Sequence, residues 1–250
     1  ERLGKEFING FAYKPFDFLK LIEDYNLLPL ILPEVETLRG VKQSPIHHPE
    51  GDVMAHTFLT LHEAQSVIRQ KGDQASDIVL GLAALLHDIG KPATKKFEEG
   101  HGWTFHGHEV IGGRMVPKIF TRLKLPQNEK MKFVRRLVEL QLRPISLTKE
   151  NITDSAIRRL LFDAGDDFDA LMTLCEADIT SKNKTKVKRF LENFEMVRKR
   201  CAEVEEKDHL RNWQPPITGE LIMQTFNLQP SRAVGDIKTA IREAILDGVI

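Results

Sequence analysis

Residues 78–90 of the chain read IVLGLAALLHDIG, and the rest of the sequence is best interpreted outward from this stretch. Its first nine residues are apolar on every face of a helix, which predicts a helix buried in the core. The stretch runs directly into His87 and Asp88. A carboxylate at the end of a buried helix is costly unless it is paired or coordinates a cation. Neighbouring residues on a helix point about 100° apart, so His87 and Asp88 are predicted to flank one ion from two sides.

Two further residues complete the predicted cation site. His56 lies at the edge of an apolar helical stripe that is made of Phe58, Leu61, Ala64 and Ile68. Asp178 continues another stripe, spaced i, i+3, i+7 and i+10, that is made of Phe168, Leu171 and Cys175. Two imidazoles and two carboxylates suit manganese, cobalt, nickel, iron(II) or zinc. Such a metal lowers the pKa of bound water and polarises a phosphoryl oxygen, so we expect hydrolysis of a phosphate ester.

Each of these residues has an ordinary structural explanation when it is considered alone. A histidine near an apolar face is most often a hydrogen-bonded core residue, and a lone buried aspartate is usually a helix cap or an ion-pair partner. The combination is harder to explain in this way. His87 and Asp88 follow a buried helix and are themselves followed by Gly90, Lys91 and Pro92. This arrangement favours the metal site.

Helical periodicity dominates the rest of the chain, and no segment alternates convincingly as a strand would. Periodic apolar residues predict helices at 16–25, 53–70, 75–88, 107–124, 128–142, 153–163, 166–180, 184–206, 218–226 and 231–247. Four of these helices follow residues that commonly cap helix N-termini, namely Asn128, Thr153, Thr218 and Ser231. We therefore predict an all-α fold, a helical bundle.

The chain is predicted to divide near residues 212–217. Pro215 and Pro216 follow a long charged helix and cannot continue it. We therefore expect a main domain at 1–211 and a small helical C-terminal extension at 212–250. Within the main domain, the segments 41–52 and 91–107 are rich in glycine, proline and histidine and are interpreted as loops. Loops on a rigid helical frame are where binding and catalytic residues tend to lie.

Composition narrows the class of protein. The chain has 250 residues with 41% hydrophobic and 29% charged content, which is typical of a soluble globular protein. Its formal net charge is zero, so overall charge gives no argument for binding nucleic acid or a membrane surface. Cys175 and Cys201 lie far apart and form no CxxC pair, which fits a cytoplasmic protein in a reducing cytosol. No apolar run reaches the ~18 residues that a membrane span needs, so we expect no membrane partner.

The ends of the chain suggest a piece of a longer protein. The sequence begins at Glu1 as though within a helix and stops on the apolar pair Val249 and Ile250. Nucleotidyl transfer needs a Gly-Ser step followed by paired carboxylates on a strand, which hold two metal ions. The one Asp-x-Asp pattern, at residues 167–169, has no Gly-Ser before it and lies at a predicted helix start. Acidic residues there favour the helix dipole, so we interpret this pattern as structural.

Basic residues gather in three local runs, at Lys182, Lys184, Lys186, Lys188 and Arg189, at Arg198, Lys199 and Arg200, and at Lys130, Lys132, Arg135 and Arg136. Such runs on helices can neutralise the phosphates of a nucleic acid. Acidic residues are interleaved with the longest predicted helix, at Glu192, Glu195, Glu203, Glu205 and Glu206. The sequence therefore leaves an RNA-contacting surface and an ordinary solvated face both open.

Several motifs resemble known families. The segments His56-Thr57, 87–92 and Ala177-Asp178 resemble the HD superfamily of metal-dependent phosphohydrolases. Further segments are similar to the HD region of bacterial tRNA nucleotidyltransferases, the CCA-adding or poly(A) polymerase type, at 32–34, Gln43, 47–53 and 105–109. Pro215-Pro216-Ile217-Thr218-Gly219 and Asp247-Gly248 resemble the C-terminal RNA-contacting segment of those enzymes. The similarity covers nearly all of the chain, and it implies an HD-domain bundle with preceding neck helices and a nucleotidyltransferase head upstream.

The resemblance also implies roles for particular residues. It places the ligands of one divalent metal ion at His56, His87, Asp88 and Asp178. Asp88 would in addition position or deprotonate the attacking water, and Lys91 would contact a substrate phosphate, unless Lys91 is an ordinary loop lysine. His108 matches a position that ligates a second metal in some branches. Gln141 stands where its partner histidine is expected, which argues for one ion and for a catalytic or substrate-side role of His108. His47 and His48 are candidates for the pocket mouth.

Three functional hypotheses follow. The first is a metal-dependent phosphohydrolase domain of a tRNA nucleotidyltransferase, with tRNA or a small phosphoester as its substrate. The resemblance implies hydrolysis of 2′,3′-cyclic phosphates and 2′-nucleotides. The second is a stand-alone HD nucleotidase. The third is an inert HD fold that serves as a tRNA-binding module.

Overall fold

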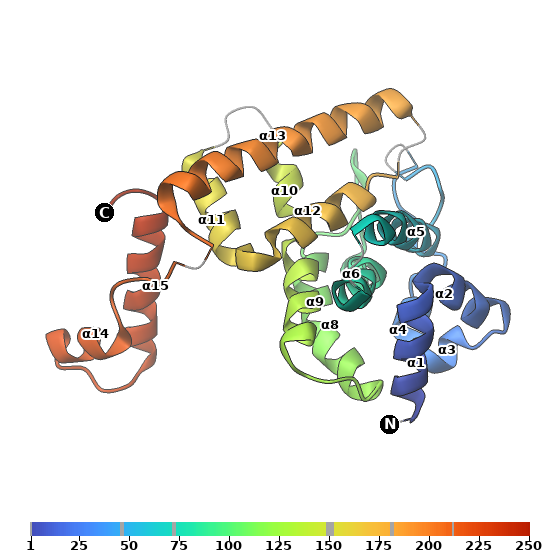
Figure 1. The fold of residues 1–250 in the computed structure, drawn as a ribbon, viewed down its shortest axis with the longest axis horizontal. Helices are drawn as coiled ribbons and strands as arrows, with labels where there is room; N and C mark the ends of the chain where they lie inside the picture. Colours follow the sequence, from blue (N-terminus) through green and yellow to red (C-terminus); the bar gives the residue numbers. More distant parts are fainter. Residues whose placement is uncertain (1, 46–47, 72–73, 149–152, 181–182, 212) are drawn as a thin grey trace.

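The computed structural model describes residues 2–45, 48–71, 74–148, 153–180, 183–211 and 213–250, with 68–71 and 74–77 described as backbone only. α-Helices make up most of these ranges (Figure 1). The helices are α1 (Arg2–Tyr13), α2 (Pro15–Asp24), α3 (Leu28–Ile31), α4 (Pro33–Glu36), α5 (Val53–Lys71), α6 (Gln74–Leu86), α7 (Lys91–Thr94), α8 (His108–Arg122), α9 (Glu129–Leu140), α10 (Arg143–Ser146), α11 (Asp154–Ala164), α12 (Phe168–Ala177), α13 (Lys184–Asp208), α14 (Gly219–Phe226) and α15 (Arg232–Leu246). The predicted all-α fold is confirmed.

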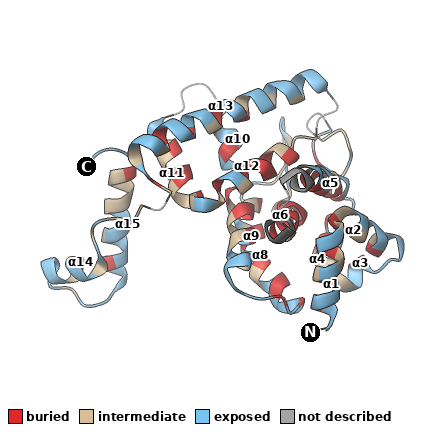
Figure 2. Ribbon diagram, viewed as in Figure 1, coloured by how far each residue is buried: buried red, intermediate tan, exposed pale blue. Residues whose placement is uncertain are grey.

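Helix α6 lies at the centre of the bundle, as its apolar sequence predicts. It packs against α1, α5, α9 and α12 (Figure 1). The residues Leu82 to Leu86 are all nearly or fully buried. Figure 2 shows buried residues gathered on the inward faces of these helices, with exposed residues on the outer faces. Burying each large aliphatic side chain stabilises the fold by about 1.5–3 kcal/mol. The packing of α6 therefore fixes the position of the turn that follows it, at residues 87–90.

The described residues also contain secondary structure that the sequence interpretation missed. Two short antiparallel strands, β1 (Lys96–Glu98) and β2 (Gly102–Thr104), form a hairpin within the segment 91–107. Each strand has three residues, which is too short for an alternating pattern to be recognised. The left-handed φ of +79° at Gly100 in the turn is a conformation that glycine adopts without strain. The predicted loop is therefore a small hairpin that is preceded by α7.

Helix boundaries agree with the capping prediction at most positions. Asn128, Thr153 and Thr218 each accept a hydrogen bond from a backbone N–H of the following first turn. Ser231 takes the N-cap position of α15 without a side-chain bond. Helix ends differ more from the prediction, because α6 stops at Leu86 instead of residue 88, and α12 stops at Ala177 instead of residue 180. The residues just beyond those ends belong to the candidate site.

The ends of the chain are built differently. At the N-terminus, Phe7 and Phe11 of α1 are buried and stack with ring centroids 5.5 Å apart. At the C-terminus, α14 and α15 form a helical pair that projects from the bundle (Figure 1). Arg159 of α11 joins this pair to the main domain through ion pairs with Glu243 and Asp247. Within the described part of the chain, none of the helices combines the length and apolarity that crossing a bilayer requires.

Candidate metal centre

The ends of three helices converge on one place in the bundle. His87 and Asp88 lie in the turn that follows α6, Asp178 is the C-cap of α12, and Gln141 is the C-cap of α9. The C-terminal end of a helix carries partial negative charge from its unpaired carbonyl groups. The backbone therefore favours a cation at this point. The expectation that His87 and Asp88 lie within the helix is wrong, but the turn still directs both side chains to the same point.

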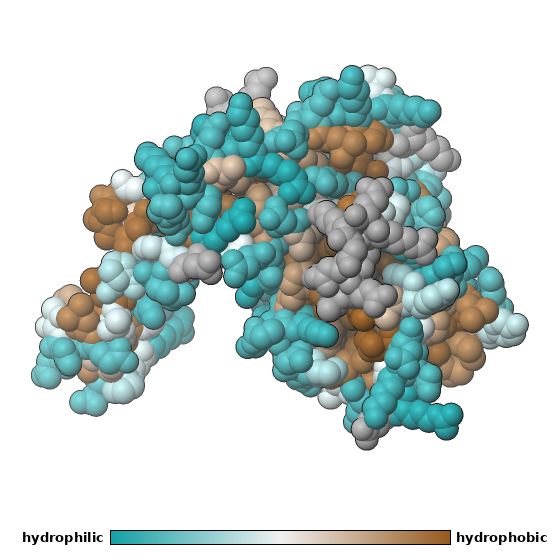
Figure 3. Space-filling model, in the orientation of Figure 1, coloured by the Kyte–Doolittle hydropathy of each residue, from teal (hydrophilic) through white to brown (hydrophobic). Residues whose placement is uncertain are grey.

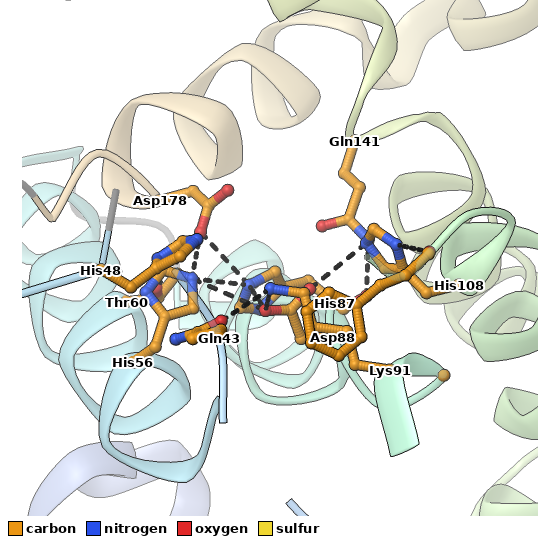
Figure 4. A network of polar contacts seen from close by, with 12 residues as sticks. Gln43, His48, His56, Thr60, His87, Asp88, Lys91, His108, Gln141 and Asp178 are labelled. Atoms are coloured by element: carbon orange, nitrogen blue, oxygen red, sulfur yellow. Dashed lines mark hydrogen bonds and ion pairs between the residues drawn. The ribbon is translucent and has the colours of Figure 1, made fainter. Parts of the chain in front are cut away.

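His56 reaches the same point from the first turn of α5. Asp52 caps this helix by accepting hydrogen bonds from the backbone N–H of Ala55 at 2.9 Å and of Gly40 at 2.6 Å. The cap fixes the start of α5 against the preceding loop and so fixes the direction of His56. Figure 4 shows His56, His87 and Asp178 pointing toward one another, with Asp88 beside them.

The ligand atoms of the four predicted residues lie close together. Nε2 of His56 is 3.4 Å from Nε2 of His87 and 2.8 Å from Oδ1 of Asp178. Nε2 of His87 is 3.2 Å from the same Asp178 oxygen and 3.2 Å from Oδ2 of Asp88. The distance from Oδ2 of Asp88 to Nε2 of His56 is 3.6 Å. Atoms bound ~2.1 Å from one ion stand ~3.0 Å apart at right angles and ~3.4 Å apart in a tetrahedron. The five separations run from 2.8 to 3.6 Å, which is close to this range, and His56, His87 and Asp178 form a group that could hold a metal ion.

Hydrogen bonds orient both imidazoles toward the centre. Nδ1 of His87 donates to the backbone carbonyl of Ala84 at 2.8 Å, and Nδ1 of His56 lies 2.6 Å from Oε1 of Glu50. Glu50 also accepts a hydrogen bond from Thr180 at 2.7 Å. When Nδ1 carries the proton, Nε2 presents its lone pair, which is the form that binds a metal. A carboxylate or carbonyl behind a ligating histidine is the usual support of such a site.

The charges of the centre are strongly coupled. Burial lowers the pKa of His87, but Asp88 and Asp178 outweigh burial and raise it to about 10. Burial also lowers the pKa of His56, but Asp178 outweighs burial, so the pKa of His56 is raised. Burial raises the pKa of Asp88 and Asp178, yet the neighbouring His87 keeps the pKa of both carboxyls well below the usual value. The buried carboxylate of Asp88 and the partly buried one of Asp178 are therefore stabilised by positive charge, which protons or a divalent cation can supply.

One buried oxygen of the centre forms ion pairs but no hydrogen bond. Oδ2 of Asp88 lies 2.6 Å from Nζ of Lys91 and 3.2 Å from Nε2 of His87. A cation between His56, His87 and Asp88 would find a free lone pair on this oxygen. The donor set and its geometry therefore fit a divalent metal ion, whose identity they do not distinguish.

Lys91 and His108 also contact the Asp88 carboxylate, Lys91 at Oδ2 and His108 at Oδ1. Lys91 is buried, and its Nζ donates to Oε1 of Gln43 at 3.1 Å. Nδ1 of His108 donates to the carbonyl of Phe105 at 2.8 Å, which leaves its Nε2 3.3 Å from Oδ1 of Asp88. Gln141 donates to the backbone carbonyl of His87 at 2.5 Å. Gln141 thus supports the turn of His87 at the position where a second histidine would stand.

A cleft of about 450 Å³ opens beside this centre, and it is lined by Gln43, Ser44, His48, Lys91, Trp103, Thr104, Phe105, His106, Gly107, His108, Glu109 and Leu142. His48 is half-buried, and its ring contacts that of His56 with centroids 4.4 Å apart. The structure therefore brings His48, Lys91 and His108 together at one opening. The prediction for His47 lies outside the described residues.

Sequence reasoning missed several polar residues of the centre. Glu50, Thr180 and Gln43 hold His56 and Lys91 in place through hydrogen bonds. Glu50 and Gln43 belong to the segments that carry the family resemblance, but nothing in their spacing assigns them a role. Their contacts join residues up to 130 positions apart, which no local pattern predicts.

The other charged groups that the sequence singled out are engaged elsewhere. Asp167 pairs with Arg136, and Asp169 pairs with Arg198, so this Asp-x-Asp pattern serves the packing of α9, α12 and α13. Several members of the basic runs also pair with acidic neighbours, among them Lys132 with Glu129, Arg135 with Glu139 and Arg200 with Asp154. Figure 3 shows hydrophilic side chains along most of α13. These contacts favour a solvated face over a free basic track.

Fold and site together define a helical protein with a largely buried His-His-Asp-Asp centre suited to a divalent metal. Comparison with known families finds the HD domain over residues 53–180, so the chain belongs to the HD domain family. It is 30% identical over 227 residues to an A-adding tRNA nucleotidyltransferase of Deinococcus radiodurans, a match of 89% of the chain and 49% of that protein.

Two further relatives carry the name multifunctional CCA protein. The one from Xylella fastidiosa strain M23 is 30% identical over 71% of the chain and 41% of its own length. The one from Legionella pneumophila is 28% identical over 82% of the chain and 48% of its own length. The resemblance to the HD region of tRNA nucleotidyltransferases is thereby confirmed. The chain spans about half the length of these relatives.

Glu50 offers a test of the hydrogen bonds that support the centre. We expect Glu50→Gln to weaken divalent metal binding by about 10–100-fold, because the carboxylate that orients and polarises His56 is lost. Calorimetric titration with manganese or cobalt measures this change. Glu63→Gln removes an exposed carboxylate from α5, the helix that carries His56, and is expected to leave the affinity unchanged. Equal affinities of the Glu50 variant and the wild type would contradict the supporting role.

Proposed function

We propose that the chain is a metal-dependent phosphohydrolase domain. The observation that carries the proposal is the convergence of His56, His87, Asp88 and Asp178 on one point beside a cleft that also contains Lys91. In this proposal the four residues are the ligands of one divalent ion. When bound, such an ion supplies an acidic water and polarises a phosphoryl oxygen.

The surrounding residues supply the rest of the proposed chemistry. Oδ2 of Asp88 lies at the ion site, and Oδ1 lies 3.3 Å from Nε2 of His108. In this proposal the carboxylate accepts a hydrogen bond from the attacking water and so orients it. Lys91 lines the cleft and can turn its ammonium from Asp88 to a substrate phosphate, as a charge-assisted donor. His108 lies on the substrate side, and His48 lines the mouth of the cleft.

We further propose that this domain acts within a tRNA nucleotidyltransferase, in processing of the tRNA 3′ end. The names of the relatives support this context. Residues 1–211 would form the HD domain with its neck helices, residues 212–250 an RNA-contacting segment, and the transfer domain would lie upstream. Substrates would be 2′,3′-cyclic phosphates, which are diesters, or phosphomonoesters such as 2′-nucleotides. The free, buried thiols of Cys175 and Cys201 support a location in the reducing cytosol.

A panel of reactions tests the proposed function. The chain is assayed on a nucleoside 2′,3′-cyclic phosphate, a nucleoside 2′-monophosphate and p-nitrophenyl phosphate, with manganese, cobalt, nickel or magnesium. We expect hydrolysis of at least one of these esters. This hydrolysis should stop when a chelator removes the metal and should return when the metal is restored. Binding of tRNA without hydrolysis of any ester under any metal would contradict the proposal and favour an inert RNA-binding module.

A further inference from the structure

The hairpin β1–β2 places aromatic side chains at the cleft beside the metal centre. Trp103 lines this cleft and is 38% exposed, which is unusual for so large an apolar ring. Across the hairpin, Phe97 packs against it edge to face with ring centroids 5.1 Å apart. Phe105 follows two residues later and also lines the cleft. Trp103 and Phe105 therefore lie at the same cleft, with Thr104 between them.

Lys91 lies between the metal centre and the aromatic wall, by which we mean Trp103 and Phe105. Its Nζ lies 2.6 Å from Oδ2 of Asp88 and 5.3 Å from the centroid of the Phe105 ring. A second lysine, Lys95, holds its Nζ 4.2 Å from the centroid of Trp103. A single ligand in this cleft could therefore place an anionic group at Lys91 and an aromatic group against the hairpin.

Polar side chains line the cleft beside the aromatic ones. Among them are Gln43, Ser44 and Thr104. The Gln43 orientation is fixed because Lys91, which only donates, faces its Oε1. Such side chains can bind the N–H and acceptor groups of a ligand. The volume of about 450 Å³ falls within the roughly 300–1,000 Å³ of small-molecule sites.

We propose that this cleft binds the base of a nucleotide, stacked on Trp103 with Phe105 beside it, while the phosphate lies toward Lys91. A nucleobase combines a flat π-face with donors and acceptors on its edge, which matches the exposed ring of Trp103 and the polar side chains of the cleft. The direction of the phosphate rests on the proposed function, whereas binding of the base does not. The base can belong to a free nucleotide or to the end of an RNA strand.

Equilibrium binding tests this proposal without any need for turnover. The chain has two tryptophans, so Trp213→Phe leaves Trp103 as the only indole reporter. Trp213 packs on Phe162, away from the residues that line the cleft. Titration with a nucleoside 3′-monophosphate is expected to quench the fluorescence of Trp103. Ribose 5-phosphate, which carries no base, is expected to leave the fluorescence largely unchanged.

Two substitutions separate stacking from packing, with binding followed by calorimetry. Trp103→Leu keeps an apolar side chain but removes the π-face, and we expect about tenfold weaker binding of the nucleotide. Trp103→Phe keeps an aromatic face and is expected to bind within about twofold of wild type. Affinity for ribose 5-phosphate should be the same in all three proteins. Equal nucleotide affinity of the leucine variant and wild type would overturn the proposal, as would an equal loss for both ligands.

A short oligoribonucleotide distinguishes the two sources of the base. If it binds more tightly than the mononucleotide and shows the same tenfold loss in Trp103→Leu, the subsite takes the end of an RNA strand. If the two bind equally and both show the loss, the subsite takes a free nucleotide. Either result supports the base subsite, and neither depends on hydrolysis. Failure of the phosphohydrolase proposal is therefore distinguishable from failure of this one.

Discussion

Replacing Asp88 with alanine is expected to lower metal-dependent phosphoester hydrolysis by at least about 1,000-fold. The substitution removes one proposed ligand and also the carboxylate between Lys91 and His108. A bound ion supplies several kcal/mol of transition-state stabilisation, and ~4 kcal/mol corresponds to about three decades in rate. The measurement is kcat/KM for the best substrate of the panel, at saturating metal.

A matched control variant tests whether the loss of any carboxylate lowers the rate of hydrolysis. Asp236 lies on α15 and is exposed, and it pairs with Arg232 at 3.8 Å. Asp236→Ala is expected to keep the wild-type rate. Circular dichroism shows whether the Asp88 variant retains its helices. A folded Asp88→Ala protein with more than about a tenth of the wild-type rate would exclude Asp88 from the reacting centre.

The substitution Gly90→Ala is expected to destabilise the fold by about 3 kcal/mol or more. The φ of Gly90 is −83°, so backbone freedom is not the reason for glycine. A Cβ there would lie 2.1 Å from the carbonyl oxygen of His108 and 2.8 Å from the backbone nitrogen of Gly112. Both are backbone atoms of α8 and cannot turn aside. The start of α8, which carries His108, would have to move away from the turn that carries Asp88.

Thermal unfolding measures this effect, and a second glycine provides the control. A loss of ~3 kcal/mol is expected to lower Tm by about 10 °C in a chain of this size. Gly235 lies inside α15, and a Cβ there meets nothing within 4 Å. Gly235→Ala is expected to raise stability by up to about 1 kcal/mol, because alanine is the better helix former. Equal stabilities of Gly90→Ala and wild type would show that α8 does not constrain the turn at residues 87–90.

The helical fold and the four central residues could be predicted because both leave strong local signals. The apolar run at 78–86 can only be buried, and a carboxylate that follows it needs a cation. Asp178 is recognisable for the same reason, as a charge that ends an apolar stripe. Burial of polar groups is costly, and sequence patterns report it well.

The remaining features depend on contacts that no short pattern records. Each of the four-residue helices α3, α4, α7 and α10 is a single turn, below the length at which periodicity is recognised. The same is true of the hairpin. Gln43 contacts Lys91 across 48 positions, and Glu50 contacts Thr180 across 130. These pairs are set by the packing of whole helices. The sequence therefore predicts which four residues lie together at the centre and misses the residues that hold them in place.

Native mass spectrometry after loading with manganese or cobalt tests the central claim most directly, by counting the ions that each chain retains. The four-residue centre predicts one ion per wild-type chain. It predicts no retained ion in His87→Ala, which removes an imidazole that lies within 3.4 Å of three other ligand atoms. Retention of one ion by a folded His87→Ala protein, or of two ions by the wild type, would contradict the account.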